Sequence, residues 1–269
     1  MTDAVKLKTV RIIVLITYLI MIAVNGLANA LPINNLTTGE VSDSFPNLFA
    51  PTALTFSIWG LIYLLLAAYT LYQLGLFQKE GGGERSGLLV KIGTLFAISS
   101  LVNALWIFSW HYLSIGLSLV LMLILLVLLI AINLQTHREQ LNARESFFIR
   151  LPFALYFGWI TVATVANVTA LLVFSGWNAF GIAEQTWAVI IIAVGLLIGA
   201  ATTLRFKSIP YGLVIIWAYI GIWIKHASAD GLAGSYPAVI VTVIISIVLM
   251  VALIIYLLSK GKGKTAVGA

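Results

Sequence analysis

Apolar runs long enough to cross a membrane recur along this chain and constrain its fold more than any other feature. Hydrophobic residues make up 61% of the sequence, charged residues only 9%, and the mean hydropathy is +1.08. A membrane-spanning helix needs about 20 apolar residues, and it satisfies its own backbone hydrogen bonds in the hydrocarbon. The sequence therefore predicts an all-α, polytopic transmembrane bundle of about eight spans, at residues 9–31, 52–76, 89–110, 113–134, 150–174, 186–204, 209–225 and 238–258.

The basic residues fall on alternate sides of these predicted spans. Of the 15 lysines and arginines, 14 lie before the first span, in the second, fourth and sixth loops or in the tail, and only Lys225 lies on the other side. Because basic residues are retained on the cytoplasmic side, both termini are predicted to be cytoplasmic, in a bacterial cytoplasmic membrane. The net charge of +6 then reflects topology and contact with the lipid bilayer. Without a folded basic surface, nucleic-acid binding is not expected.

The N-terminus has a second interpretation. Basic residues before an apolar run, followed by the small residues 28–30, are also typical of a cleaved signal peptide. The run from Ile12 to Leu31 is longer than the roughly 7 to 15 residues of a signal-peptide core, which favours a retained first span. Cleavage of residues 1–30 stays an alternative and leaves the remaining topology unchanged.

The second, third and fifth predicted spans carry tryptophan together with asparagine or tyrosine on one helical face. Residues spaced three, four, seven or eight apart return to the same side of a helix. The first span adds two asparagines, four apart, near its outer end. We expect these faces to line a chamber in the outer half of the membrane, built from Asn25, Asn29, Pro51, Trp59, Tyr63, Asn103, Trp106, Trp110, Tyr156, Trp159 and Asn167.

The longest outer loop, residues 32–51, is placed to close such a chamber. It mixes turn-forming residues and two carboxylates with Phe45, Pro46 and Phe49, so it could fold back over the cavity mouth. The alternative is a solvated connector that caps the following helix.

The residue types of the chamber indicate the kind of ligand. Tryptophan and tyrosine offer large flat apolar surfaces with one polar tip each, which suits stacking on a planar or polycyclic ligand. Asparagine orients a polar edge without the cost of burying a charge, and we expect this role of Asn103 and, in part, of Asn167. The alternative is that the asparagines join helices by hydrogen bonds. For Trp177, Trp187 and Trp223, near helix ends, the membrane-interface belt is favoured over a pocket.

These motifs resemble those of a known family. Pro51, Trp59 and Tyr63, then Asn103, Trp106 and Trp110, then Tyr156, Trp159, Ala163-Thr164 and Asn167 are similar to the second, third and fifth helices of the TspO/MBR family, the tryptophan-rich sensory and translocator proteins. The resemblance covers roughly residues 10–175. It implies a five-helix module, residues 1–175, that binds porphyrins or other tetrapyrroles, and in some members sterols, for sensing or carriage, with no required cofactor. It also implies a homodimer and regulation linked to stress or light.

The chain also departs from the family pattern. Ala53 replaces a usual tryptophan, Leu155 a usual proline, and Trp110-His111 a usual aromatic pair, while the first outer loop lacks a tryptophan-rich lid. Three further predicted spans, in residues 176–269, follow the motifs. We interpret the chain as one continuous membrane domain of an extended, eight-helix branch.

Two other function classes, a transporter and an enzyme, are alternatives for a chain of this kind. A facilitative transporter of a small apolar compound fits eight spans, whereas proton-coupled transport normally needs ionisable groups inside the membrane, and Lys91, His111, Arg150 and Lys225 all lie near span ends. An enzyme is less favoured because the three histidines have no metal-ligand spacing, cysteine is absent, and no nucleophile–base set is apparent. No catalytic or metal-binding residue is predicted, although an activity on tetrapyrroles, raised by the resemblance, stays an alternative.

Overall fold

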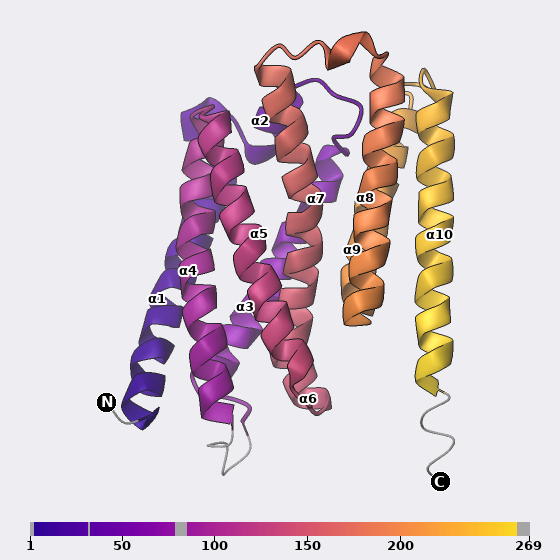
Figure 1. Cartoon of the computed structure of the whole chain (residues 1–269). Coiled ribbons are helices and arrows are strands. Elements are labelled where there is room, and N and C mark those ends of the chain that lie inside the picture. The colour runs from indigo at the N-terminus through magenta and orange to yellow at the C-terminus, as the bar shows by residue number, and fades with distance from the viewer. Residues whose placement is uncertain (1–2, 32, 79–84, 263–269) are drawn as a thin grey trace. The chain divides into compact units, whose positions relative to one another are not determined.

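A computed structural model describes residues 3–31, 33–78 and 85–262, and within them eight helices are long and apolar enough to cross a membrane. The predicted all-α, multi-pass fold is confirmed, with span ends within a few residues of expectation for most helices; the cytoplasmic placement of the termini stays a prediction. In chain order the elements are α1 (Asp3–Ala30), η1 (Ile33–Asn35), α2 (Thr38–Asp43), η2 (Ala53–Ser57), α3 (Ile58–Gln73), α4 (Ser86–His111), α5 (Ile115–Arg138), α6 (Ala143–Glu145), η4 (Ser146–Arg150), α7 (Leu151–Phe174), η5 (Ala179–Gly181), α8 (Glu184–Phe206), α9 (Ile209–Ala227) and α10 (Pro237–Lys262) (Figure 1).

The helices form two compact units that alternate along the sequence. Unit 1 consists of residues 1–44 and 58–160, and unit 2 of residues 45–57 and 161–269, so α7 contributes to both. The division at residue 175 rests on the family resemblance, and this domain boundary stays a prediction.

In unit 1, α4 lies between α1 and α5 (Figure 1). Gly93 on α4 permits a close approach to two neighbours: a Cβ added there would lie 2.6 Å from Val10 Cγ1 on α1 and 2.7 Å from Gln73 Nε2 on α3. The same Gln73 amide donates to the backbone oxygen of Leu89, at 3.0 Å, and so joins α3 to α4. The small residue and the buried amide together fix the spacing of the helices that carry the site.

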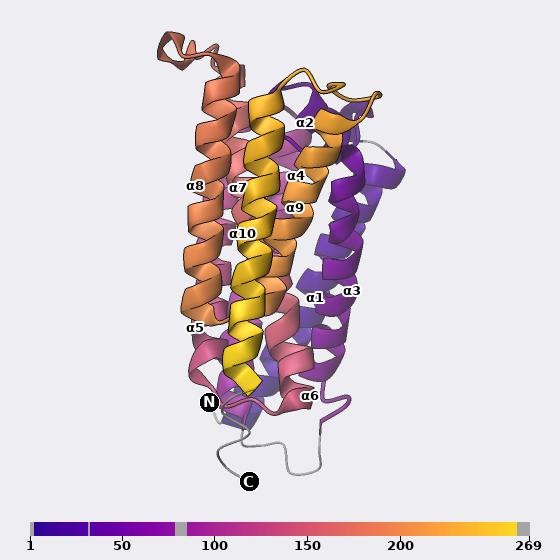
Figure 2. The ribbon, with the colours of Figure 1, turned by 90° about the vertical axis from the view of Figure 1, so that its right-hand side faces the viewer.

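In unit 2, α8, α9 and α10 run side by side (Figure 2). The short η2 is held along α9, because Trp217 Nε1 donates to Thr55 O at 2.9 Å and Thr52 N donates to Gly221 O at 3.3 Å. These bonds hold residues 53–57 in a tight 3₁₀ turn. The regular helix α3 therefore begins at Ile58 and not near residue 52, where the apolar run predicted its start.

Candidate ligand-binding site

A chain of buried and part-buried hydrogen bonds joins four helices of unit 1. Tyr63 Oη donates to Asn25 Oδ1 at 2.6 Å, Asn25 Nδ2 donates to Asn103 Oδ1 at 2.6 Å, and Asn103 Nδ2 donates to Tyr156 Oη at 3.0 Å. Asn103 and Tyr156 have no exposed surface, and Asn25 is 6% exposed. In an apolar bundle each polar group needs such a partner, so these bonds set the rotation of α1, α3, α4 and α7 about their axes.

Trp59 stands at the centre of an aromatic cluster beside this polar chain. Its ring stacks on Tyr63, with centroids 5.2 Å apart and an interplanar angle of 20°, and it meets Trp106 at 6.4 Å. Tyr156 and Trp159 approach it edge-on, at 5.9 and 6.1 Å. Three helices, α3, α4 and α7, thus bring their predicted faces together around one half-buried indole.

Trp106 carries a buried donor that the neighbouring residues leave unused. Its side chain is 5% exposed, it stacks on Trp110 at 5.9 Å, and Nε1 has no hydrogen-bond partner among the described residues. A buried N–H without an acceptor costs about 1 to 3 kcal/mol. In contrast, Trp110 Nε1 donates to Thr38 O at 3.2 Å.

The first outer loop is fastened to the end of α4 by His111. One ring nitrogen, Nε2, lies 3.0 Å from Thr38 Oγ1, the other, Nδ1, lies 3.1 Å from Ile33 O, and Asn34 Nδ2 donates to His111 O at 3.0 Å. The carbonyl of Ile33 only accepts, so Nδ1 carries a proton. From sequence, His111 is a departure from the family pattern and an ionisable residue near a span end, and its contact with the first outer loop was not predicted. The signal for it was that this span end and the loop, which is rich in asparagine and threonine, lie on the same predicted side of the membrane.

The segment that His111 holds is a short helix within the expected loop. Thr37 and Glu40 form a reciprocal capping box at the start of α2, in which Thr37 N donates to Glu40 Oε2 at 2.7 Å. Hydrogen bonds from the backbone and side chain of Thr37 lower the pKa of the exposed Glu40 carboxyl. The capping bonds are therefore complete above the ordinary carboxyl pKa and weaken as the pH falls through the lowered value. Part of the loop is thus an ordered element packed on α4.

The contacts described above do not include three of the eleven predicted residues. Asn29 is exposed, and its amide donates to the backbone oxygen of Asn25 on its own helix, at 2.9 Å. Pro51 and Asn167 are both buried, but they belong to unit 2, whereas the other nine belong to unit 1. The described residues contain no group of three or more histidines and carboxylates that could hold a metal ion.

Comparison with known families gives a match over most of the chain. The model of the TSPO-like protein family matches residues 11–256, which is most of the chain. The match extends past residue 175, where the three quoted motifs end, and takes in α8, α9 and most of α10. Neither a curated protein nor a solved structure matches the sequence.

Proposed function

Since the chain belongs to the family of TSPO-like proteins and is an integral, multi-pass membrane protein, we propose that its aromatic cluster binds a planar or polycyclic, largely apolar ligand for sensing or carriage. Tetrapyrroles are the proposed class, because the family resemblance implies them and their flat conjugated rings suit stacking on indole and phenol. The residues proposed to contact the ligand are those of unit 1: Asn25, Trp59, Tyr63, Asn103, Trp106, Trp110, Tyr156 and Trp159.

The observation that carries the proposal is the unused donor of Trp106 within the stacked rings. In the proposed complex a flat ligand stacks on rings of the cluster, and Trp106 Nε1, a buried donor without a partner among the described residues, bonds an acceptor on the ligand's edge. An acceptor there would remove the desolvation cost that the donor bears without a ligand. A cluster built only for helix packing would gain nothing from a donor in this place.

The cluster is also suited to a neutral or weakly polar ligand face. Its polar groups are indoles and phenols, and the hydrogen-bond chain beside it adds two amides; all are uncharged. Orienting a ligand through such groups costs less desolvation than burying an ion. The charge of an ionic substituent would therefore have to stay outside the ring stack.

Titration of the purified chain with porphyrins, bilins and sterols tests the function. We expect saturable quenching of tryptophan fluorescence and a shifted visible absorbance with a planar tetrapyrrole. Protein-free membrane discs of the same lipid serve as the control for partitioning. Quenching that rises linearly with ligand, as it does with simple partitioning, would contradict the proposal.

Replacing Asn103 by leucine separates ligand orientation from helix joining. Because Asn103 bonds both Asn25 and Tyr156, we expect a lower melting temperature from the loss of interhelical bonds, worth about 0.6 to 2 kcal/mol. We also expect affinity to fall by about 1 to 3 kcal/mol, because a directional partner of the ligand is lost.

Asn133 provides the matched control for Asn103. It is 6% exposed, lies in unit 1, and its amide donates across helices to Phe153 O at 3.1 Å, yet it is not part of the aromatic cluster. Asn133→Leu should lower the melting temperature and leave affinity unchanged. If Asn103→Leu behaves in the same way, Asn103 joins helices and does not orient a ligand.

A further inference from the structure

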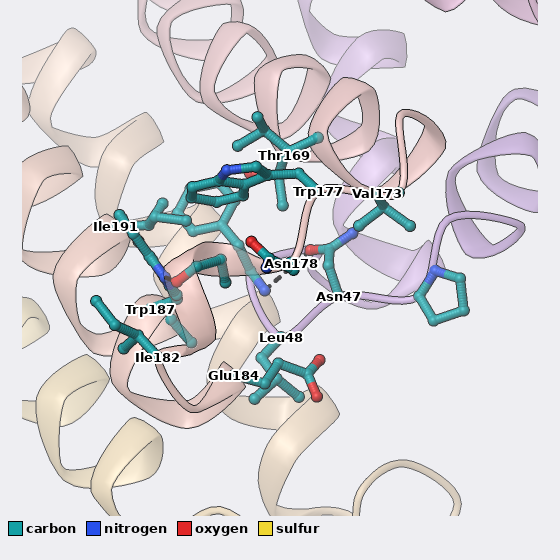
Figure 3. A pocket seen from close by; sticks show the side chains of 16 residues that line it. Asn47, Leu48, Thr169, Val173, Trp177, Asn178, Ile182, Glu184, Trp187 and Ile191 are labelled. Carbon is teal, nitrogen blue, oxygen red and sulfur yellow. Dashed lines mark hydrogen bonds between the residues drawn. The ribbon is translucent and has the colours of Figure 1, made fainter.

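Unit 2 contains a cavity of about 600 Å³ where α7 ends and α8 begins. Residues 46–49, which precede η2, form one part of its lining, and the end of α7, the following turn and the first turns of α8 form the rest (Figure 3). All sixteen lining residues belong to unit 2, and none is among those proposed to bind the planar ligand. The cavity therefore needs an explanation of its own.

Two indoles dominate the lining. The rings of Trp177 and Trp187 lie 5.0 Å apart at an interplanar angle of 60°, and Trp187 Nε1 donates to Ala179 O at 2.8 Å. The turn that carries Trp177 is also fixed, since Asn178 Oδ1 accepts from Phe180 N at 3.1 Å. The indole N–H of Trp187 is thus bonded within the turn, which leaves the π surface of its ring for contact with a ligand. A membrane-interface belt, expected for these residues from sequence, does not require two indoles at one cavity.

The charge of the lining has one sign. Glu184, at the start of α8, is the only ionisable residue among the sixteen, and it is exposed. A helix start ordinarily favours an anion, but here a carboxylate already occupies that first turn. The side-chain oxygen of Asn47 is already used within its own loop, because Oδ1 accepts from Phe49 N and Ala50 N. Asn47 therefore adds little to the preference of the cavity for one sign of charge.

Carboxylate and indole faces are the two groups that proteins combine to bind bulky organic cations. We propose that this cavity binds an amphipathic organic cation, whose charged centre lies at Glu184 and the indoles of Trp177 and Trp187. The apolar part of the ligand packs against the aliphatic side chains that complete the lining, among them Leu48, Ile182 and Ile191 (Figure 3). An ammonium or phosphonium centre with apolar substituents has this chemistry, and a small hydrated metal cation does not.

Equilibrium dialysis with tetraphenylphosphonium tests the site. The full chain in uncharged maltoside micelles should bind this cation saturably, and it should bind the neutral triphenylphosphine oxide at least about fivefold more weakly, since the neutral compound gains no cation–π or ion-pair energy. Empty micelles correct both values for partitioning. Equal affinity for the cation and the neutral compound would overturn the proposal.

Substitutions assign the binding to this cavity. Glu184→Gln should weaken tetraphenylphosphonium binding about fivefold and Trp187→Ala about tenfold, while Trp187→Phe, which keeps a ring, should lose less. Asp230→Asn is the matched control, because Asp230 is another exposed carboxylate of unit 2 and does not line the cavity. Melting temperatures of each variant exclude loss of fold as the cause. The assignment would be overturned if Glu184→Gln bound tetraphenylphosphonium with wild-type affinity, or if Asp230→Asn lost as much affinity as Glu184→Gln. It would also be overturned if Trp59→Ala lost affinity and the cavity variants did not.

Competition identifies the source of the cation. A choline lipid headgroup and a free organic cation share the bulky ammonium chemistry, so dioctanoyl phosphatidylcholine is added to the dialysis and compared with dioctanoyl phosphatidylglycerol. Displacement by the choline lipid alone supports the site and assigns it to a lipid headgroup. Displacement by neither supports the site for a free organic cation. Equal displacement by both lipids would show that the probe sits among acyl chains, and would overturn the proposal.

Discussion

Replacing Trp59 or Trp159 by alanine is expected to weaken binding of the planar ligand by about 1 to 3 kcal/mol, the scale of one buried aromatic contact. Trp59 should show the larger effect, because its ring meets Tyr63, Trp106, Tyr156 and Trp159. The measurement is a titration of each variant by visible absorbance, since removing a tryptophan changes the fluorescence signal itself.

Trp223→Ala is the control for this pair of substitutions. Trp223 lies on α9 in unit 2, is 41% exposed and is not a member of the aromatic cluster, so its loss removes an indole from the chain and leaves every ring of the cluster in place. Its affinity for the ligand should equal that of the wild type. If all three variants lose affinity equally, general destabilisation explains the result and the binding assignment fails.

Replacing Gly221 by alanine is expected to destabilise the chain by about 1 to 3 kcal/mol, the cost of overpacking a filled interior. A Cβ at this position would clash with Thr55 Oγ1 and would lie 2.9 Å from Thr55 Cβ. Thr55 is 1% exposed and its carbonyl is held by Trp217, so it has little room to move away. Thermal unfolding followed by intrinsic fluorescence measures the loss.

Two further variants test the cause of that loss. At Gly26, in α1, nothing lies within 4 Å of an added Cβ, so Gly26→Ala should cost nothing. Adding Thr55→Ala to Gly221→Ala removes two of the three crowding atoms and should restore part of the stability. A Gly221→Ala chain as stable as Gly26→Ala would show that η2 does not approach α9 this closely.

The membrane fold was predictable from sequence because a single physical constraint dominates it. Hydrocarbon leaves a chain no external hydrogen-bond partners, so length and hydropathy alone mark each span. Helical periodicity then predicted which faces carry Trp59, Trp106 and Trp159, and the structure brings these three faces together. Which side chains share a face of one helix depends only on their spacing within that helix, so the local sequence is enough to predict it.

Features that depend on contacts between distant residues were not predictable in this way. The 3₁₀ turn before α3 is held by hydrogen bonds to Trp217 and Gly221 on α9. Trp217 lies 162 positions after its partner Thr55 in the sequence. The contact of His111 with the first outer loop likewise requires a helix end and a distant loop to meet. Helical spacing placed Asn29 beside Asn25, yet only Asn25 faces a partner helix. A sequence pattern gives the side of a helix, and only packing decides what lies opposite.

The hydrogen-bond chain from Tyr63 through Asn25 and Asn103 to Tyr156 gives unit 1 a fixed rotational register. Apolar helices in lipid present similar surfaces at many angles, so dispersion alone distinguishes these settings weakly. Turning one helix by a single residue, about 100°, would carry its amide or phenol away from its partner and strand polar groups in hydrocarbon. The hydrogen bonds thus select one rotation about its own axis for each of the four helices. Substitutions that preserve this bundle must therefore change the four hydrogen-bonding residues together or leave all four unchanged.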